Sequence, residues 1–507
     1  MAVGLGGLLT ACRDGQPSAV ASVSGPQQAG GRLRVGLSGG GAADSLDAHS
    51  PVSTTDIARV LNLYEGLLYR DENYELHPLL ATRATASPDA RIWTVDLRTD
   101  VTFHDGRPMT GRDVAATFRR ITDPKDPKTG ASSLAILDQV VVLNDFKVEF
   151  RLNTPTATFD DSLGQYSLGI VPEDYDPANP IGTGPFIYRS FSPGRSSLFA
   201  RNEQYWRGGN EPYLDELEIL NFNDNDALIN ALLSTQVDAI GQIPLALLEV
   251  IDADPRIGIL NSETGMWMPF SMRVDKPPFN DKRVRQAFRL AVDREQMIEQ
   301  VLSGNGRVGN DLYSPFDPGY ASHLPQRVQD ISKAKELLAE AGYPNGLSVE
   351  LVTAPIQAGA VEAAQVFAEQ AAAAGIKVNL RRVDTTTFFG DGYLQWDFAQ
   401  SFWYTRNFLP QVNNSSLPTS PFNETHWDHP EFAQLVAMAT ASVDPEKRNR
   451  LISQAQEIEY DEGGYIIWGH PNQADAYQQY VAGLVPSRTG LALSGFEFRR
   501  VWLGKVL

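Results

Sequence analysis

The sequence contains a single cysteine, Cys12, among its 507 residues. One thiol cannot form an internal disulfide, so we expect a body of this size to be stabilised without disulfides. Beyond the N-terminus the sequence also lacks any run approaching the ~18–20 consecutive apolar residues that span a bilayer. The body of the protein is therefore expected to lie outside the membrane.

Basic residues are scarce relative to acidic ones. The chain has 43 Lys and Arg against 62 Asp and Glu, which gives a formal net charge of -19. Such a surface repels phosphate backbones and anionic lipid headgroups, so we exclude nucleic-acid binding. The hydrophobic fraction of 42% is ordinary for a soluble globular protein, and the length predicts two or three domains, because single cores stop growing at roughly 250–300 residues.

The surroundings of Cys12 are those of an export signal. An apolar N-terminus ends in Leu9-Thr10-Ala11, and a polar run begins at Arg13. This resembles the lipobox of bacterial lipoproteins, which implies a signal peptide over 1–11 and a lipid on the Cys12 sulfur. No Lys or Arg precedes the apolar stretch, so we expect the true start of the signal to lie upstream of Met1. The alternative is an N-terminal Cys without a role.

The segment 12–30 is rich in Gly, Ser, Pro, Gln and Ala and has no apolar period. It is predicted to be a flexible tether between the lipid and the folded body.

From Arg32 onward the pattern is mixed α and β. Apolar alternation predicts a strand over 32–38 and a pair of strands over 92–103 that ends in Asp105-Gly106. A capping box predicts a helix over 111–121. In the second half, 347–382 is predicted to form a βαβ unit with a parallel sheet.

Three motifs suggest chemistry that the surrounding sequence does not support. Ser38 stands in a G-x-S-x-G pattern, but a Gly-rich loop follows it where a hydrolase elbow needs a helix. The G-x-G-x-x-G match at 304–309 follows a helix instead of a strand. His426 and His429 are three positions apart with no third ligand close by, and Pro430 ends the segment. We therefore predict no catalytic residues and no metal site.

Five spaced stretches carry a resemblance to a known family. In order, they resemble the extracytoplasmic solute-binding proteins of the oligopeptide, dipeptide and nickel ABC importers, also known as family 5. The stretches are 101–121, 181–191, 202–219, 277–306 and 334–346.

The resemblance implies an α/β, bilobal, periplasmic-binding-protein-like (type II) Venus flytrap with an inserted extra domain. Ligand would bind between the lobes, and the closed form would deliver it to permease subunits driven by ATPase subunits. The segments expected for lobe I are 31–68, 186–275 and 470–507, the inserted domain is expected at 69–185, and lobe II at 276–469.

The sequence departs from the peptide-binding members at one position. Those members carry a W-x-x-D-x-x-x-P pattern whose Asp pairs with the free α-amine of a peptide. Here Trp403 and Pro410 fit the pattern, but Arg406 stands at the Asp position. Since a guanidinium repels an ammonium and favours carboxylate or phosphate, we expect an acidic ligand instead of a free-amine peptide. The alternative is that Arg406 pairs with a neighbouring Asp or lies outside the cleft.

Further candidate ligand contacts are aromatic or lie in the loop after the first strand. Aromatic side chains stack on ligands, and family members often place one just ahead of the 277–306 helix. The candidates, besides Arg406, are Trp403, Tyr404, Trp267, Asp47 and His49.

The sequence thus predicts a monomeric, lipid-anchored substrate-binding subunit of an ABC importer on the outer face of the cytoplasmic membrane. It would bind a small organic solute, peptide-like or other, without a cofactor and without transforming it. Two alternatives remain open, namely a ligand sensor that reports to a membrane receptor kinase and a secreted hydrolase that uses Ser38.

Overall fold

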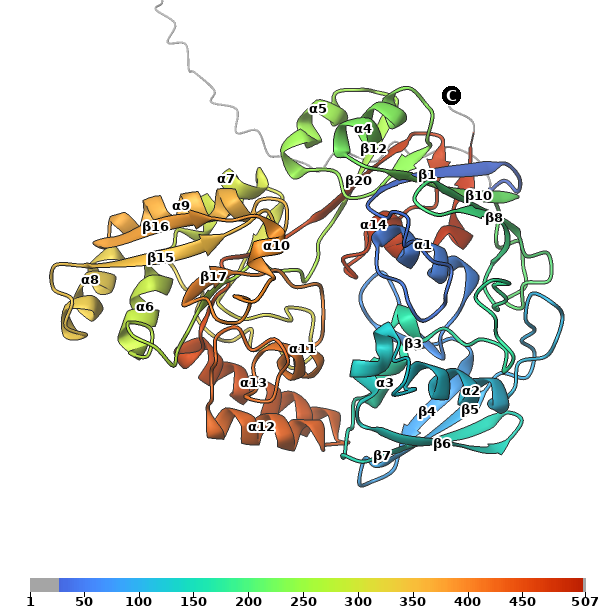
Figure 1. Cartoon of the computed structure of the whole chain (residues 1–507), viewed down its shortest axis with the longest axis horizontal. Coiled ribbons are helices and arrows are strands. Elements are labelled where there is room, and N and C mark those ends of the chain that lie inside the picture. Colours follow the sequence, from blue (N-terminus) through green and yellow to red (C-terminus); the bar gives the residue numbers. More distant parts are fainter. Residues whose placement is uncertain (1–26, 505–507) are drawn as a thin grey trace, which may run out of the picture.

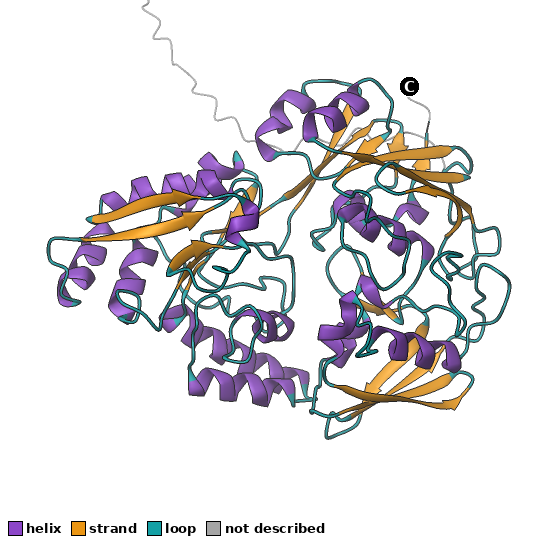
Figure 2. Cartoon of the chain, viewed as in Figure 1, coloured by secondary structure: helices purple, strands orange, loops and turns teal. Residues whose placement is uncertain are grey.

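Two lobes lie side by side in the protein, whose structure is a computed structural model that describes residues 27–504 (Figure 1). Cys12 and the predicted signal peptide lie outside the described residues. Helices and strands alternate in both lobes (Figure 2), as the α/β prediction requires. Within residues 27–504, no helix is both long and apolar enough to cross a bilayer.

Lobe I contains a seven-stranded sheet in the order β12-β20-β11-β1-β10-β9-β8. The predicted strand over 32–38 is confirmed as β1, which is parallel to both β10 and β11 and whose Leu33, Val35 and Leu37 are fully buried. The strands are β1 (Arg32–Ser38), β8 (Phe186–Ser192), β9 (Ser196–Arg201), β10 (Glu216–Phe222), β11 (Ala239–Ile240), β12 (Ile257–Ser262) and β20 (Gln473–Gln478). Its helices are α1 (Thr54–Leu63), α4 (Asn225–Leu233), α5 (Leu248–Asp252) and α14 (Ala492–Gly495).

A four-stranded antiparallel sheet, in the order β4-β5-β7-β6, forms the part of lobe I at the lower right of Figure 1. The predicted helix over 111–121 is confirmed as α2, and the capping box of Thr110 and Asp113 begins it. The other elements are β4 (Ala81–Ala86), β5 (Ile92–Leu97), β6 (Leu137–Asn144), β7 (Lys147–Leu152), α3 (Phe159–Leu163) and the hairpin β2 (Leu68–Arg70) with β3 (Leu76–Pro78).

The prediction of a strand pair over 92–103 is confirmed for the first strand, β5, and wrong for the second strand and for the pairing. β5 ends at Leu97 and pairs with β4 and β7 instead of with the segment that follows it. The turn at Asp105-Gly106 exists, since the Gly106 N–H donates to the Phe103 carbonyl at 2.8 Å. Among residues 27–504 the arm that includes Phe103 forms a single bridge, between Thr102 and Pro108, while β5 already has a partner strand on each side.

Lobe II contains a five-stranded sheet in the order β16-β15-β17-β13-β18. The predicted βαβ unit is confirmed by the parallel strands β15 and β16 with α9 between them. The strands are β13 (Phe270–Met272), β15 (Leu347–Thr353), β16 (Ile376–Arg382), β17 (Phe398–Gln400) and β18 (Tyr465–Ile466). The helices are α6 (Lys282–Leu290), α7 (Arg294–Leu302), α8 (Ile331–Glu340), α9 (Ala360–Ala372), α10 (Thr385–Phe388), α11 (Phe408–Ser415), α12 (Pro430–Thr440) and α13 (Pro445–Glu462).

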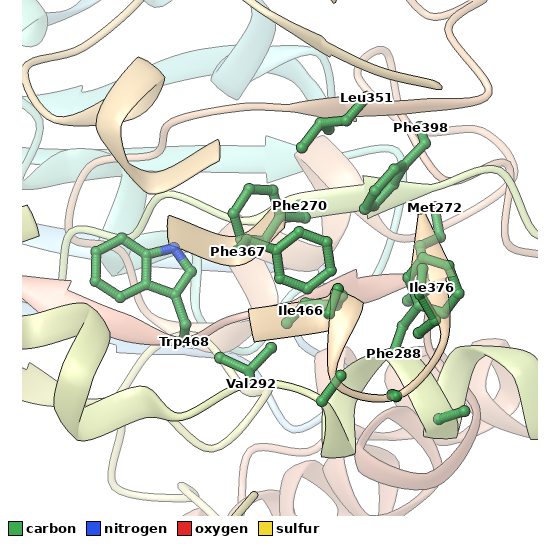
Figure 3. Packing of buried hydrophobic residues seen from close by; sticks show 14 of the residues in the cluster. Phe270, Met272, Phe288, Val292, Leu351, Phe367, Ile376, Phe398, Ile466 and Trp468 are labelled. Carbon is green, nitrogen blue, oxygen red and sulfur yellow. The ribbon is translucent and has the colours of Figure 1, made fainter. Parts of the chain in front are cut away.

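The core of lobe II packs phenylalanines between the sheet and its helices (Figure 3). Phe270 of β13 lies 4.6 Å from Phe367 of α9, measured between ring centroids, and Phe398 of β17 packs against both. This core holds β17 in place, and the candidate ligand residues Trp403, Tyr404 and Arg406 follow β17 in the sequence.

The chain passes between the lobes twice, close to residues 263–269 and 471–473. Thr264 Oγ1 donates to the Pro471 carbonyl at 2.7 Å and so joins the two passages. β13 pairs with β17 and β18, so residues 270–272 belong to lobe II and the first passage lies before residue 270, not at 275 as expected. Likewise β19 (Gly469–Pro471) pairs with β14 (Gly306–Val308) of lobe II.

Candidate functional site

The segment 403–407 follows β17. It faces the inserted part of lobe I, which contains the β2–β3 hairpin and α3. Trp403 is held by two backbone hydrogen bonds with Trp267, one in each direction, at 2.9 and 3.1 Å. Thr405 Oγ1 accepts the Gly265 N–H at 2.9 Å and donates to the Arg488 carbonyl at 2.9 Å. The segment is therefore fixed to the first passage between the lobes.

A row of stacked rings supports Trp403 from behind. Trp267 lies between Trp403 and Tyr313, with ring centroids 5.8 and 5.1 Å away, and Phe408 continues the row beyond Tyr313. Trp267 is only 1% exposed, and its contact with a ligand stays a prediction. Its surface is taken up by neighbouring rings, and it positions Trp403.

Trp403 and Tyr404 lie where the lobes meet, and their role as ligand contacts stays a prediction. Tyr404 is 47% exposed. Trp403 is largely buried, and within residues 27–504 its indole Nε1–H has no hydrogen-bond acceptor. A buried donor without a partner costs free energy, so this group is suited to a ligand acceptor.

Arg406 lies over the Trp403 ring, with its Cζ 5.5 Å from the ring centroid. Its only hydrogen bond within residues 27–504 is a long one, from Nη1 to the Gln411 side-chain oxygen at 3.5 Å. No described carboxylate forms an ion pair with it. Burial lowers the pKa of Arg406, and the groups that oppose this shift are the tyrosines Tyr74, Tyr166 and Tyr404.

Two of these tyrosines belong to the inserted part of lobe I and were not among the sequence candidates. Tyr74, in the β2–β3 turn, donates from Oη to the Thr405 carbonyl at 3.0 Å. Tyr166 is 37% exposed. Both lie more than two hundred positions from Arg406 in the sequence, so no local motif points to them.

Further contacts join the lobes beside this surface. Asn407 Nδ2 donates to the Asp161 carboxylate at 3.3 Å, and Asp161 also pairs with Arg70. The Ala157 N–H donates to the Thr440 carbonyl at 2.7 Å. Lobe I therefore touches lobe II along α3 and the β2–β3 hairpin, with Arg406 at the same interface.

Asp47 and His49 are buried and hydrogen-bonded within lobe I, and their role as ligand contacts stays a prediction. Arg120 of α2 donates to both Asp47 oxygens, at 2.9 and 2.7 Å, and to His49 Nδ1 at 2.6 Å, while His49 Nε2 donates to the Gly169 carbonyl at 2.8 Å. Burial lowers the pKa of His49 to about 4, so the ring is neutral at pH 7. Burial alone would raise the pKa of Asp47, but the Arg120 guanidinium outweighs it and holds the pKa below its usual range.

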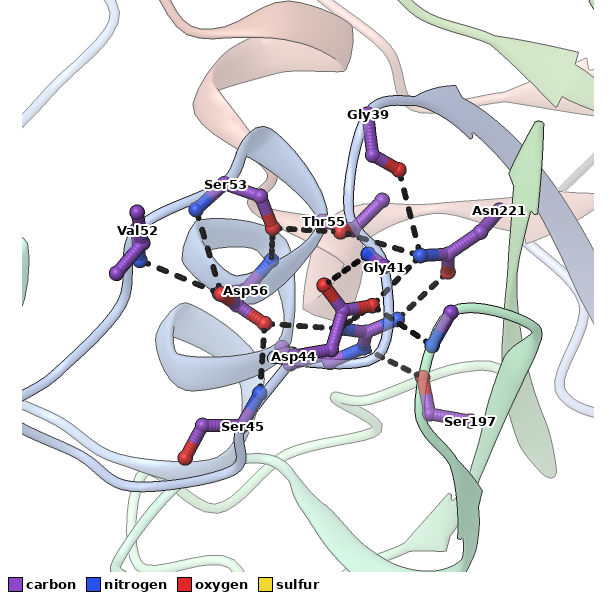
Figure 4. A network of polar contacts seen from close by, with 12 residues as sticks. Gly39, Gly41, Asp44, Ser45, Val52, Ser53, Thr55, Asp56, Ser197 and Asn221 are labelled. Atoms are coloured by element: carbon purple, nitrogen blue, oxygen red, sulfur yellow. Dashed lines mark hydrogen bonds and ion pairs between the residues drawn. The ribbon is translucent and has the colours of Figure 1, made fainter. Parts of the chain in front are cut away.

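The rest of the loop after β1 is held in place by Arg59 of α1, which is fully buried. Figure 4 shows the polar network of this loop, in which Asp44, Asp56 and Asn221 lie close together. The Arg59 guanidinium donates to Asp44 at 3.0 Å, Asp56 at 2.9 Å and Asn221 at 2.6 Å. A loop with this many internal partners is part of the lobe I scaffold.

The catalytic and metal motifs have structural explanations. Ser38 ends β1, and the next helix, α1, begins only at Thr54, so the hydrolase elbow is absent. His426 Nε2 contacts the Leu394 carbonyl at 2.8 Å, and His429 caps α12.

One further cluster has ligand-type atoms within 4.8 Å of one another: Asp71, Glu75 and His77. The Asp71 carboxylate accepts hydrogen bonds from the backbone N–H groups of Asn73 and Glu75. These bonds form a turn, and the turn brings the three side chains together.

Comparisons with known proteins agree on one family. The model of the bacterial extracellular solute-binding proteins, family 5 middle, matches residues 75–425, which is more than half of the chain. Heme-binding protein A of Haemophilus influenzae is 26% identical over 83% of this chain and 84% of its own. The glutathione-binding protein GsiB of Escherichia coli K12 is 24% identical over 83% and 86%.

Solved structures agree with the fold. The structure of the PBP AgaA from A. tumefaciens R10, in complex with agropinic acid, is 26% identical with a TM-score of 0.76 and covers 94% of this chain and 99% of that one. HbpA2 from Haemophilus parasuis is 25% identical with a TM-score of 0.81, covering 94% and 100%.

Proposed function

The chain belongs to family 5 of the bacterial extracellular solute-binding proteins and is a substrate-binding protein of an ABC importer, and we propose that its ligand is a small organic solute with an acidic group held by Arg406. Proteins of this family are not enzymes. They work outside the cytoplasm and deliver small molecules to permease subunits.

The observation that carries this proposal is the state of the Arg406 guanidinium. It is partly buried between the lobes, next to three tyrosines and the Trp403 Nε1–H, which has no acceptor within residues 27–504, and no described carboxylate pairs with it. A planar guanidinium binds carboxylate or phosphate with two parallel hydrogen bonds. An acidic group on the ligand would supply the acceptor that the protein itself lacks here.

The same charge disfavours peptides with a free N-terminus. An ammonium beside Arg406 would meet a like charge in a poorly hydrated site, which costs several kcal/mol unless another acid compensates. Among the similar proteins, one solved structure holds agropinic acid and another protein is named for binding glutathione. The family therefore includes binding proteins for ligands other than ordinary peptides.

Native mass spectrometry of the purified protein tests the ligand class directly. A retained small molecule that carries a carboxylate or phosphate and no free α-amine supports the proposal. A retained peptide with a free N-terminal amine would overturn the acidic-ligand proposal while leaving the importer function intact.

Substitution then tests the residue. Arg406→Gln should weaken binding of the identified ligand about tenfold or more, since hydrogen bonds to charged groups contribute ~1.5–3 kcal/mol. Arg381→Gln is the matched control, because Arg381 lies on β16 in the same lobe, where it forms an exposed ion pair with Glu350 and lies over the Trp396 ring instead of near Trp403. Equal affinities of the two variants would contradict the role of Arg406.

We further propose that the protein is a monomer attached to the membrane through a lipid on Cys12. The sequence around Cys12 and the Gly- and Ser-rich segment after it support this attachment. Cys12→Ala should move the protein from the membrane fraction to the soluble fraction. A variant that stays with membranes as well as the parent would contradict the anchor.

A further inference from the structure

A pocket of about 580 Å³ lies away from the Arg406 surface, between the β2–β3 hairpin and the segment 206–213. This volume is within the range of small-molecule sites, which often form where two parts of a fold meet. Its wall is made by Tyr69, Pro78, Leu79, Arg98, the residues from Trp206 to Glu211, and Tyr213.

The central charged group of this pocket is Arg207. Its side chain is 19% exposed, and within residues 27–504 its guanidinium makes no hydrogen bond. The nearest carboxylate, Glu65, is 4.0 Å away and already accepts hydrogen bonds from Thr183, Tyr205 and Trp206. Arg207 is therefore a partly buried cation whose guanidinium N–H groups donate no hydrogen bond within residues 27–504.

Stacking holds Arg207 in place without using its N–H groups. Its Cζ lies 5.3 Å from the Tyr69 ring centroid and 5.4 Å from that of Trp206. A second guanidinium, that of Arg98, lies 4.6 Å from the Trp206 centroid and pairs with the exposed Asp100. Cation–π contacts of this kind fix the plane of a guanidinium and leave its edge available to an acceptor.

The backbone of the same wall adds donors. Gly208 and Gly209 both have positive φ, at 68° and 74°, and the space next to each is open. In the part of the chain that the structure describes, the N–H groups of Gly209 and Asn210 make no hydrogen bond. The one acid of the wall, Glu211, is paired with Arg499. Successive free N–H groups beside a cation are a common setting for anions.

The pocket and the Arg406 surface lie on opposite sides of one hairpin. Successive residues of a strand point to opposite faces, so Tyr69 contacts Arg207 on one side while Arg70 pairs with Asp161 on the other. A molecule in the pocket would not contact Arg406.

We propose that this pocket is a second binding site, for a small organic anion whose carboxylate or phosphate is held by Arg207 and the neighbouring backbone N–H groups. Tyr69, Pro78 and Leu79 provide an apolar wall for the rest of such a molecule. The protein as a whole carries a net charge of -19, whereas the two arginines of this pocket, Arg207 and Arg98, provide a local positive charge.

Fluorine NMR with fluorobenzoate and fluorophenyl phosphate tests the proposal on the purified protein. Saturable binding of either probe is expected, it should persist in Arg406→Gln, and it should weaken about tenfold or more in Arg207→Gln. The tighter of the two probes identifies the anion class. Absence of saturable binding would overturn the proposal, as would binding that Arg406→Gln abolishes and Arg207→Gln leaves unchanged.

A second variant protects the test against misfolding of Arg207→Gln. Asn210 is an exposed residue of the rim, so Asn210→Asp adds a negative charge without disturbing packing. It should also weaken probe binding while the melting temperature stays at that of the parent. Unchanged probe affinity in Asn210→Asp would count against an anion at this rim. Because the ligand of the Arg406 surface is not used, failure here leaves the proposed function untouched.

Discussion

The indole of Trp267 lies parallel to that of Trp403, with ring centroids 5.8 Å and ring planes 15° apart. Trp267 is enclosed, whereas Trp403 carries Arg406 over its ring. The buried Trp267 ring therefore fixes the position of the Trp403 ring, and with it the position of the Arg406 guanidinium at the interface between the lobes.

Trp267→Ala should lower the free energy of unfolding by about 3–5 kcal/mol, because it leaves a cavity between Tyr313 and Trp403. Denaturant unfolding measures this loss. Trp267→Phe keeps a stacked ring and should lose less than half as much. A loss below about 1 kcal/mol in the alanine variant would show that the row of rings does not support Trp403.

Gly182→Ala should destabilise lobe I by about 2 kcal/mol or more, because a Cβ there would lie 2.1 Å from the Leu63 carbonyl oxygen. The requirement for glycine comes from this close approach, since Gly182 is not among the residues with positive φ. Gly41→Ala is the control, as no atom lies within 4 Å of its added Cβ. Similar melting temperatures for the two variants would refute the steric argument.

Tyr74→Phe should weaken ligand binding about two- to tenfold, because it removes the hydrogen bond to the Thr405 carbonyl that forms only when the lobes meet. The identified ligand can be titrated calorimetrically. Tyr188→Phe, on β8 and without a side-chain hydrogen bond among the described residues, is the control. An unchanged affinity in Tyr74→Phe would mean that this contact does not favour the closed form.

Glu424→Gln should alter how stability depends on pH. The buried Glu424 carboxyl, which accepts from Ser271, Ser401 and Tyr393, has its pKa raised by burial to about 7. Its stabilising contribution is complete below the unfolded pKa of 4.5 and is lost as pH rises through about 7, at most about 3 kcal/mol. Denaturant titrations at pH 5 and 8 should show a smaller decrease for the variant. Identical pH profiles would contradict the shift.

His104→Gln should act in the opposite sense. Burial lowers the pKa of His104 to about 4, and its Nε2 contacts the Gly184 carbonyl at 3.0 Å. The contribution of the neutral ring is complete above the unfolded pKa of 6.5 and is lost as pH falls through about 4. The variant should lose less stability than the parent between pH 7 and 4, measured by thermal unfolding. An equal acid sensitivity would contradict the prediction.

The sequence was informative where a signal is local. The capping box at Thr110 predicts α2 to the residue, and the alternation from Arg32 predicts β1. Arg406 was singled out because it replaces an acid within a short motif, and among the described residues it has tyrosines near it and no ion pair with a neighbouring Asp.

The sequence was less informative about the surroundings of a residue whose contacting partner is distant in the sequence. Asp47 and His49 stand in a polar loop and resemble ligand contacts, but Arg120, more than seventy positions later, buries them. Trp267 is hidden by Tyr313 and Tyr465, and nothing near Trp267 in the sequence indicates either ring. Tyr74 and Tyr166 reach Arg406 only through the packing of the two lobes.

The position of β20 in the lobe I sheet has a consequence for the order of folding. β20 lies inside the sheet, between β12 and β11, and all of its residues from Gln473 to Gln478 are buried. This strand comes after the whole of lobe II in the sequence. During synthesis, β11 and β12 therefore lack the strand that lies between them until β20 has been made. Lobe II, contiguous from β13 to β18, can assemble first, and the nascent chain therefore keeps an open sheet edge in lobe I until its final segment emerges.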